Sequence, residues 1–158
     1  MTSELKQKYT LRITQANKTE MIVILYDMLL DYIKDAKAVL ELDNKEQFHK
    51  EIKHARGCVE ELIASLNLEY ELARNYLQLY SYVNRELASA DAGNHIKALE
   101  NAQMVISELK EAYVEISKQD TSPAVMSNTQ SVYAGLTYGK TDLKEDLMNH
   151  SGNRGFLV

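Results

Sequence analysis

Apolar residues recur at alternating spacings of three and four in four stretches of this chain, and this pattern constrains the fold more than any other feature. Such spacing places side chains on one face of an α-helix. In the first stretch, residues 17–42, the repeating positions are Ile22, Tyr26, Leu29, Ile33, Ala36 and Leu40. Asn17 followed by Glu20 has the pattern of a capping box. We therefore expect a helix that begins just after Asn17.

Three further amphipathic stretches follow, separated by short polar breaks. The second begins after Asp43, which can cap a helix with Glu46, and its apolar positions are Phe48, Ile52, Ala55, Val59, Leu62 and Leu66. The third is expected over residues 70–90, with apolar positions Ala73, Tyr76, Tyr80, Val83, Leu87 and Ala90. The fourth has Leu99, Ala102, Ile106, Leu109, Tyr113 and Ile116. Gly93, between the last two, suits a left-handed helix cap.

The stretch from residue 18 to residue 119 lacks the residues that interrupt helices. It contains no proline and only two glycines, Gly57 and Gly93. Because the connections are short, neighbouring helices are expected to run antiparallel. The sequence therefore predicts an all-α fold, an antiparallel up-down-up-down four-helix bundle over residues 18–119.

The two ends of the chain differ from this central part. Residues 1–17 are mostly polar, and we expect an extended or frayed N-terminal arm whose apolar residues lie on the bundle, with a disordered terminus as the alternative. Residues 120–158 hold the only proline and four of the six glycines. They are predicted to form an extended or partly helical tail, with a β-like pattern over 131–138 and a helical one over 141–148.

The composition argues against several classes of function. A net charge of −5 does not suit a nucleic-acid partner, which requires clustered Lys and Arg. No window holds the roughly 18 uninterrupted apolar residues of a membrane span, and no signal-peptide pattern opens the chain. The single cysteine, Cys58, cannot form an internal disulfide and is typical of a reducing compartment. We therefore expect a cytoplasmic protein with no membrane insertion and no nucleic-acid partner.

The Glu-x-x-His motif of di-metal bundles occurs twice, at residues 46–49 and 51–54. Both copies lie on one helix, although a di-metal site requires one copy on each of two facing helices. His49 and His54 are separated by about 140° around that helix and cannot converge. We expect no metal, no cofactor and no catalytic residue. The acidic residues Asp27, Asp31 and Asp35, four positions apart, are interpreted as a solvated helix edge.

Two helices carry more apolar surface than a closed bundle uses. The first has an additional strip of Met21, Ile24 and Met28, and the third has one of Leu72, Leu79 and Tyr82. One interpretation is that these residues form the rim of a large core. The other is that they line a groove that receives amphipathic segments of another protein, since Met and Tyr adapt to partner surfaces.

Three segments of the chain resemble the flagellin-specific export chaperones of the FliS family. Residues 16–33, ANKTEMIVILYDMLLDYI, are similar to the opening helix of that family, with Leu25-Tyr26-Asp27 at the expected place. Residues 66–87 resemble its third-helix region, and residues 109–116 resemble its closing helix. The resemblance covers residues 13–118, and the tail from residue 120 is longer than the family usually shows.

The resemblance implies a non-enzymatic cytoplasmic chaperone. Members of the family bind the C-terminal region of flagellin, prevent its premature polymerisation and present it to the flagellar export gate, and other flagellar regulators are further possible partners. The N-terminal arm of the family can cover a binding site until it is displaced. Positions that match the family pattern are Ile13, Leu25, Tyr26, Leu79, Tyr80 and Tyr82.

Together with the additional apolar strips, these positions give the predicted partner-binding set. It consists of Ile13, Met21, Ile24, Leu25, Tyr26, Met28, Leu72, Leu79, Tyr80 and Tyr82. Two alternatives remain open, a helical adaptor that forms a homodimer through the same strips and, less favoured, a di-metal enzyme. In the tail, residues 128–133 are loosely similar to flagellin C-termini and are a candidate for occupying the client groove.

Overall fold

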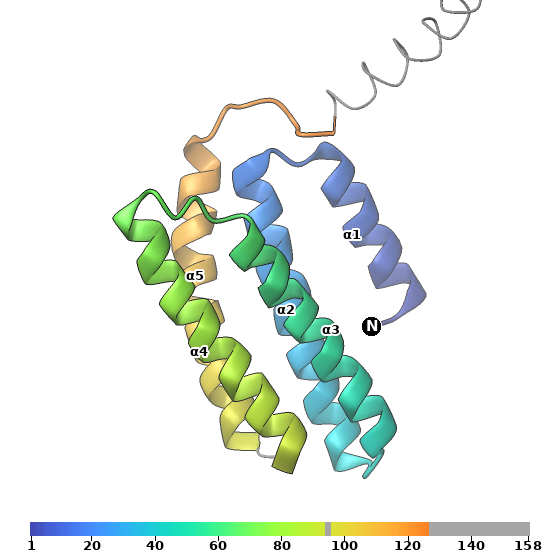
Figure 1. Cartoon of the computed structure of the whole chain (residues 1–158). Helices are drawn as coiled ribbons and strands as arrows, with labels where there is room; N and C mark the ends of the chain where they lie inside the picture. Colours follow the sequence, from blue (N-terminus) through green and yellow to red (C-terminus); the bar gives the residue numbers. More distant parts are fainter. Residues whose placement is uncertain (94–95, 127–158) are drawn as a thin grey trace, which may run out of the picture.

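The computed structural model describes residues 1–93 and 96–126, which form five α-helices (Figure 1). The helices are α1 (Ser3–Gln15), α2 (Lys18–Glu41), α3 (Lys45–Ala64), α4 (Glu71–Gly93) and α5 (Ile96–Gln119). Neither described range contains a strand, so the all-α prediction is confirmed for this part of the chain. The patterned tail segments 131–138 and 141–148, and the flagellin-like stretch 128–133, lie outside the described residues.

Helix α2 begins where the sequence predicts, because its N-terminus is closed by a capping box. The Asn17 side-chain oxygen accepts a hydrogen bond from the Glu20 backbone N–H at 2.8 Å. The Glu20 carboxylate in turn accepts one from the Asn17 backbone N–H at 2.9 Å. Two N–H groups that would otherwise lack partners are thereby satisfied.

Two of the predicted helix ends are wrong. Asn44 rather than Asp43 caps α3, and its side-chain oxygen accepts from the Gln47 N–H at 3.1 Å. Asp43 has a φ of 51°, so it turns the chain after α2 in the left-handed region that Asp and Asn tolerate. Gly93 is the last residue of α4 and no described glycine has a positive φ, so the expected left-handed cap is not formed.

Helices α2 to α5 pack around one core. Contacts join α2 to α3 and α5, and α4 to α3 and α5, and Figure 1 shows the four helices side by side. We call the repeating apolar positions of each predicted helix its seam. The fully buried side chains come from these seams and include Leu29, Ile33, Phe48, Ile52, Val59, Leu62, Val83, Leu87, Leu99 and Ile106. Burying each such side chain stabilises the fold by about 1.5–3 kcal/mol. The seams therefore identify the core correctly.

The N-terminal arm is helical, which corrects the expectation of an extended segment. Thr2 caps α1 by accepting a hydrogen bond from the Leu5 N–H at 3.3 Å. Leu5, Tyr9 and Ile13 are four residues apart and therefore share one helix face, which packs on α2 (Figure 1). Because these apolar residues are few and lie in a polar segment, their spacing alone did not predict a helix over residues 3–15.

Candidate functional site: an open groove and a covered strip

An open groove lies where α2, α4, α5 and the α3–α4 connection meet. Its volume is about 280 Å³. The lining residues are Ile22, Ser65, Leu66, Asn67, Tyr70, Leu72, Ala73, Tyr76 and Tyr113. Most of these side chains are apolar or aromatic, which is the character of a surface that binds amphipathic helices.

Helix α4 supplies the exposed apolar wall of this groove. Leu72 is 64% exposed, and Tyr70, just before the helix, is 67% exposed. Leu72 and Leu79 are both exposed and lie seven residues apart, so they form a stripe beside the one that packs into the core. One apolar stripe of α4 thus stabilises the fold, and the second remains exposed to solvent.

Two tyrosines form the floor of the groove, and two more lie beneath them in the core. Tyr76 and Tyr113 line it, with ring centroids 5.7 Å apart in an edge-to-face arrangement. Beneath them, the ring of Tyr26 lies 5.6 Å from that of Tyr113. The hydroxyl oxygens of Tyr26 and Tyr80 are 2.5 Å apart, so the two groups share a hydrogen bond. Edge-to-face pairs of this kind contribute about 0.5–1.5 kcal/mol beyond their buried area.

The phenols of Tyr26, Tyr80 and Tyr113 carry no charge near neutral pH. Burial raises the pKa of Tyr26 and of Tyr80 above the ordinary value for a phenol, and burial also raises the pKa of Tyr113. These hydroxyls therefore stay protonated. An exposed leucine wall above these neutral phenols can bind apolar side chains.

A second apolar surface lies on α2 beneath α1. Ile24 is buried, and Met21 and Met28 pack beside it. Tyr9 and Ile13 of α1 cover this strip. The strip predicted from the sequence thus exists, but in this structure the chain itself occupies it.

The aspartates along α2 hold α1 in place, so their interpretation as a solvated edge is wrong. Arg12 donates to a carboxylate oxygen of Asp27 at 2.7 Å, and the Tyr9 hydroxyl donates to Asp31 at 2.5 Å. The α-ammonium of Met1 lies 2.6 Å from a carboxylate oxygen of Asp35. The spacing of four residues, which looked like an exposed edge, places all three carboxylates along the face that meets α1.

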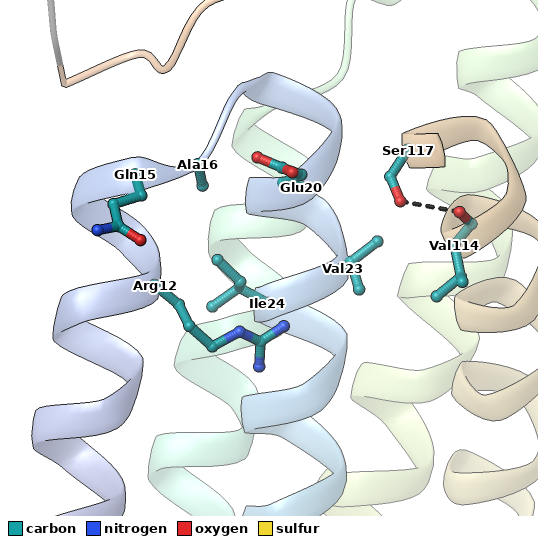
Figure 2. A pocket seen from close by; sticks show the side chains of 8 residues that line it. All are labelled: Arg12, Gln15, Ala16, Glu20, Val23, Ile24, Val114 and Ser117. Atoms are coloured by element: carbon teal, nitrogen blue, oxygen red, sulfur yellow. Dashed lines mark hydrogen bonds between the residues drawn. The ribbon is translucent and has the colours of Figure 1, made fainter. Parts of the chain in front are cut away.

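A cavity of about 480 Å³ remains between α1, α2 and α5 (Figure 2). Figure 2 shows Arg12 and Ile24 between α1 and α2, with Val114 and Ser117 of α5 across the gap. Helix α1 contacts α2 but leaves space toward α5. The pocket is open to solvent, so the side of α1 that faces α5 is not covered there.

The predicted partner-binding residues occupy three different environments. Leu72 and Leu79 are exposed on α4. Those in contact with α1 or part of it are Ile13, Met21, Ile24 and Met28. Those that pack in or against the main core are Leu25, Tyr26, Tyr80 and Tyr82. Tyr26 and Tyr80 therefore support the groove from below, and the roles of the whole set stay predictions.

Several residues that the spacing predicts to face the core do pack against it, but they also line the groove, which the spacing did not predict. These are Ile22, Leu66, Tyr76 and Tyr113, which lie at the ends of the predicted seams. A regular spacing shows which face of a helix is apolar, but it does not show where the neighbouring helix stops covering that face. Tyrosine at a seam end was an available signal, because Tyr suits positions that are half buried.

The residues of the Glu-x-x-His motifs have other partners. His49 lies 2.7 Å from a carboxylate oxygen of Asp91, and the ring of His54 stacks on Tyr32 at 5.2 Å. Within the described ranges, no group of three or more His, Cys, Asp or Glu side chains is arranged to hold a metal ion. Burial raises the pKa of the Cys58 thiol to about 12, so it is a poor nucleophile at neutral pH.

Among the residues that the structure describes, no helix is both long enough and apolar enough to cross a bilayer.

Comparison with known proteins places these features in a family. The family model described as flagellar protein FliS matches residues 1–120. The flagellar secretion chaperone FliS of Bacillus subtilis (strain 168) is 25% identical over 101 residues, which cover 64% of this chain and 76% of the relative. The protein of the same name from Escherichia coli (strain K12) is 26% identical over 106 residues, covering 65% and 78% of the two chains. The chain therefore belongs to the FliS family of flagellar proteins.

Proposed function

We propose that this protein is a cytoplasmic secretion chaperone that binds the C-terminal region of flagellin, prevents its premature polymerisation and supports its delivery to the flagellar export apparatus. Membership of the FliS family, whose relatives are named flagellar secretion chaperones, supports the general role. The observation that carries the proposal is the open apolar groove with Leu72 exposed on its wall.

In this proposal the groove receives an amphipathic helix of flagellin. Helices α2 to α5 form an antiparallel up-down-up-down bundle, and the groove lies at the end where the α3–α4 connection meets α4. Apolar side chains of the client at positions i, i+3 or i+4 and i+7 contact Leu72, Tyr76 and Tyr113. Removing Leu72 from water is favourable, at about 25 cal/mol per Å² of apolar surface buried.

The strip beneath α1 is proposed as a second client surface. A flagellin helix that replaced α1 would cover Met21, Ile24 and Met28. Helix α1 would lose its hydrogen bonds to Asp27 and Asp31. The free energy needed to break them lowers the apparent affinity of the chaperone for the client. In the free chaperone α1 keeps the apolar strip out of water, which reduces self-association.

A calorimetric titration with a peptide from a flagellin C-terminus tests this function. Leu72→Glu places a charge on the wall of the groove and is expected to weaken binding at least tenfold. Met104→Glu is the matched control, because Met104 is 58% exposed on α5 and does not line the groove. Absence of binding to the wild-type protein, or equal binding by the two variants, would contradict the proposal.

Two further kinds of partner belong to the same proposal. A component of the export gate and other flagellar regulators would bind the chaperone or its complex with flagellin, with no enzymatic step. The exposed side chains Leu68, Tyr70 and Leu72 also allow a second candidate function, a helical adaptor that forms a homodimer. A molecular mass that doubles with concentration, together with no binding of the flagellin peptide, would favour the adaptor.

A further inference from the structure

The segment that follows α5, residues 120–126, crosses the connection between α1 and α2 (Figure 1). It contains neither helix nor strand. The Val125 N–H donates to the backbone oxygen of Ala16 at 2.9 Å. Ala16 and Asn17 are the two residues between α1 and α2, so this bond lies on the hinge about which α1 would move. We call residues 120–126 the strap.

Asn17 connects the strap to the start of α2. Its side-chain oxygen caps α2, while its side-chain N–H₂ group donates to the backbone oxygens of Asp120 at 3.2 Å and Ser122 at 3.5 Å. Asn17 is buried, so an amide that lost these acceptors would lack a partner away from water. One side chain thus holds both the helix cap and the strap.

Asp120 fixes the other end of the strap. One carboxylate oxygen accepts a hydrogen bond from the Thr19 hydroxyl, and the other accepts from the Ser122 backbone N–H at 2.9 Å. Hydrogen bonds from Ser122 and Thr19 lower the pKa of Asp120, so it is ionised at neutral pH. The strap is therefore bonded to both hinge residues, Ala16 and Asn17, and to Thr19 in α2.

We propose that the strap and α1 are coupled through the Ala16–Asn17 hinge. When the strap is seated, it restricts the hinge and keeps α1 on α2. When α1 leaves, the hinge backbone changes and the strap loses its bond to Ala16. Coupling between two sites is reciprocal, so a partner that holds the strap away from the bundle releases α1, and a client that displaces α1 releases the strap. A strap released from Ala16 only after α1 has moved would mark the chaperone as loaded.

Two substitutions in the full chain remove hydrogen-bond donors to the strap. Asn17→Asp keeps an oxygen to cap α2, since Asp caps as well as Asn, but removes the N–H₂ donor to the strap. Thr19→Val removes the hydroxyl donor to Asp120 with little change in shape and none in charge. Thr121→Val is the matched control, because Thr121 is an exposed strap residue and makes the same chemical change.

Amide hydrogen exchange of α1 measures the coupling. We expect Asn17→Asp and Thr19→Val to raise the exchange rates over residues 3–15 by about threefold to tenfold, the effect of losing one or two hydrogen bonds. Exchange in α3 and α4, and in all helices of Thr121→Val, is expected to stay at the wild-type rate. Wild-type exchange of α1 in both test variants, or equal acceleration in the control, overturns the inference.

A second measurement rests on the proposed function and follows the strap itself. With a saturating flagellin C-terminal peptide, the backbone N–H groups of Ser122 and Val125 are expected to lose their protection from exchange. If the peptide binds and both groups stay protected, the coupling is wrong and the proposed function stands. If the peptide does not bind, the proposed function fails, and the hydrogen-exchange rates of α1 in the two variants alone test the coupling.

Discussion

The hydroxyl groups of Tyr26 and Tyr80 share a hydrogen bond of 2.5 Å between α2 and α4, directly beneath the tyrosines that floor the groove. Both side chains are almost completely buried. Their hydrogen bond fixes the two helices whose residues line opposite sides of the groove, so the shape of the groove depends on the core below it.

Tyr26→Phe is expected to destabilise the fold by about 1–2 kcal/mol. The substitution leaves the Tyr80 hydroxyl buried without its partner, and that loss costs more than the hydrogen bond alone contributes. Urea unfolding followed by circular dichroism measures the change. Tyr70→Phe is the control, because Tyr70 is exposed and its free energy of unfolding should change by less than about 0.5 kcal/mol. Equal effects of the two substitutions would show that the buried pair contributes nothing specific.

Stability is expected to fall in alkaline solution. Burial raises the pKa of Tyr26 and Tyr80 in the folded chain, so both phenols stay protonated there after their counterparts in the unfolded chain ionise near pH 10. Their contribution is fully present below the unfolded pKa and is lost as the pH rises toward the folded pKa. The free energy of unfolding should fall above about pH 10 by up to ~1.4 kcal/mol per pH unit for each tyrosine. Tyr26→Phe should reduce this slope, and an identical slope would refute the assignment.

Tyr9→Phe tests the attachment of α1. The substitution removes the hydrogen bond to Asp31 but keeps the aromatic ring on the apolar strip, so we expect a loss of about 0.5–1.5 kcal/mol that is confined to α1. Hydrogen exchange should accelerate over residues 3–15, while urea unfolding of the remaining helices changes little. Uniform acceleration over all five helices would mean that α1 does not open independently.

Gly57→Ala is expected to stabilise the protein by about 0.5–1 kcal/mol. Gly57 lies inside α3, where glycine is less favourable than alanine, and a Cβ built there meets nothing within 4 Å. Thermal unfolding should show a higher midpoint for the variant. A lower midpoint would reveal a steric contact that the structure does not contain.

Much of the fold follows from short-range chemistry that the sequence displays. The capping box at Asn17 and Glu20 sets the start of α2, and seam residues such as Phe48 and Ile106 are buried as the spacing predicts. These features depend on neighbours within one or two turns of the same helix, so the sequence is sufficient to recognise them.

The parts that were missed depend on contacts between distant segments. Asp31 looked exposed because nothing in its own helix shows that Tyr9 covers it. Tyr76 and Tyr113 pack against the core as their spacing predicts, but the spacing does not show that they also line the groove. The strap could not be predicted for the same reason, because Asp120 and Thr19 are far apart in the sequence and meet only in the folded chain.

Photo-crosslinking from the groove tests the central claim most directly. A photoreactive phenylalanine derivative is placed at residue 72 in one variant and at residue 104 in another, both exposed apolar positions, and each variant is irradiated with flagellin. The account predicts a crosslink to the flagellin C-terminal region from residue 72 and none from residue 104. A crosslink from residue 104 alone, or none from residue 72 while flagellin is bound, would contradict the assignment of the groove as the client site.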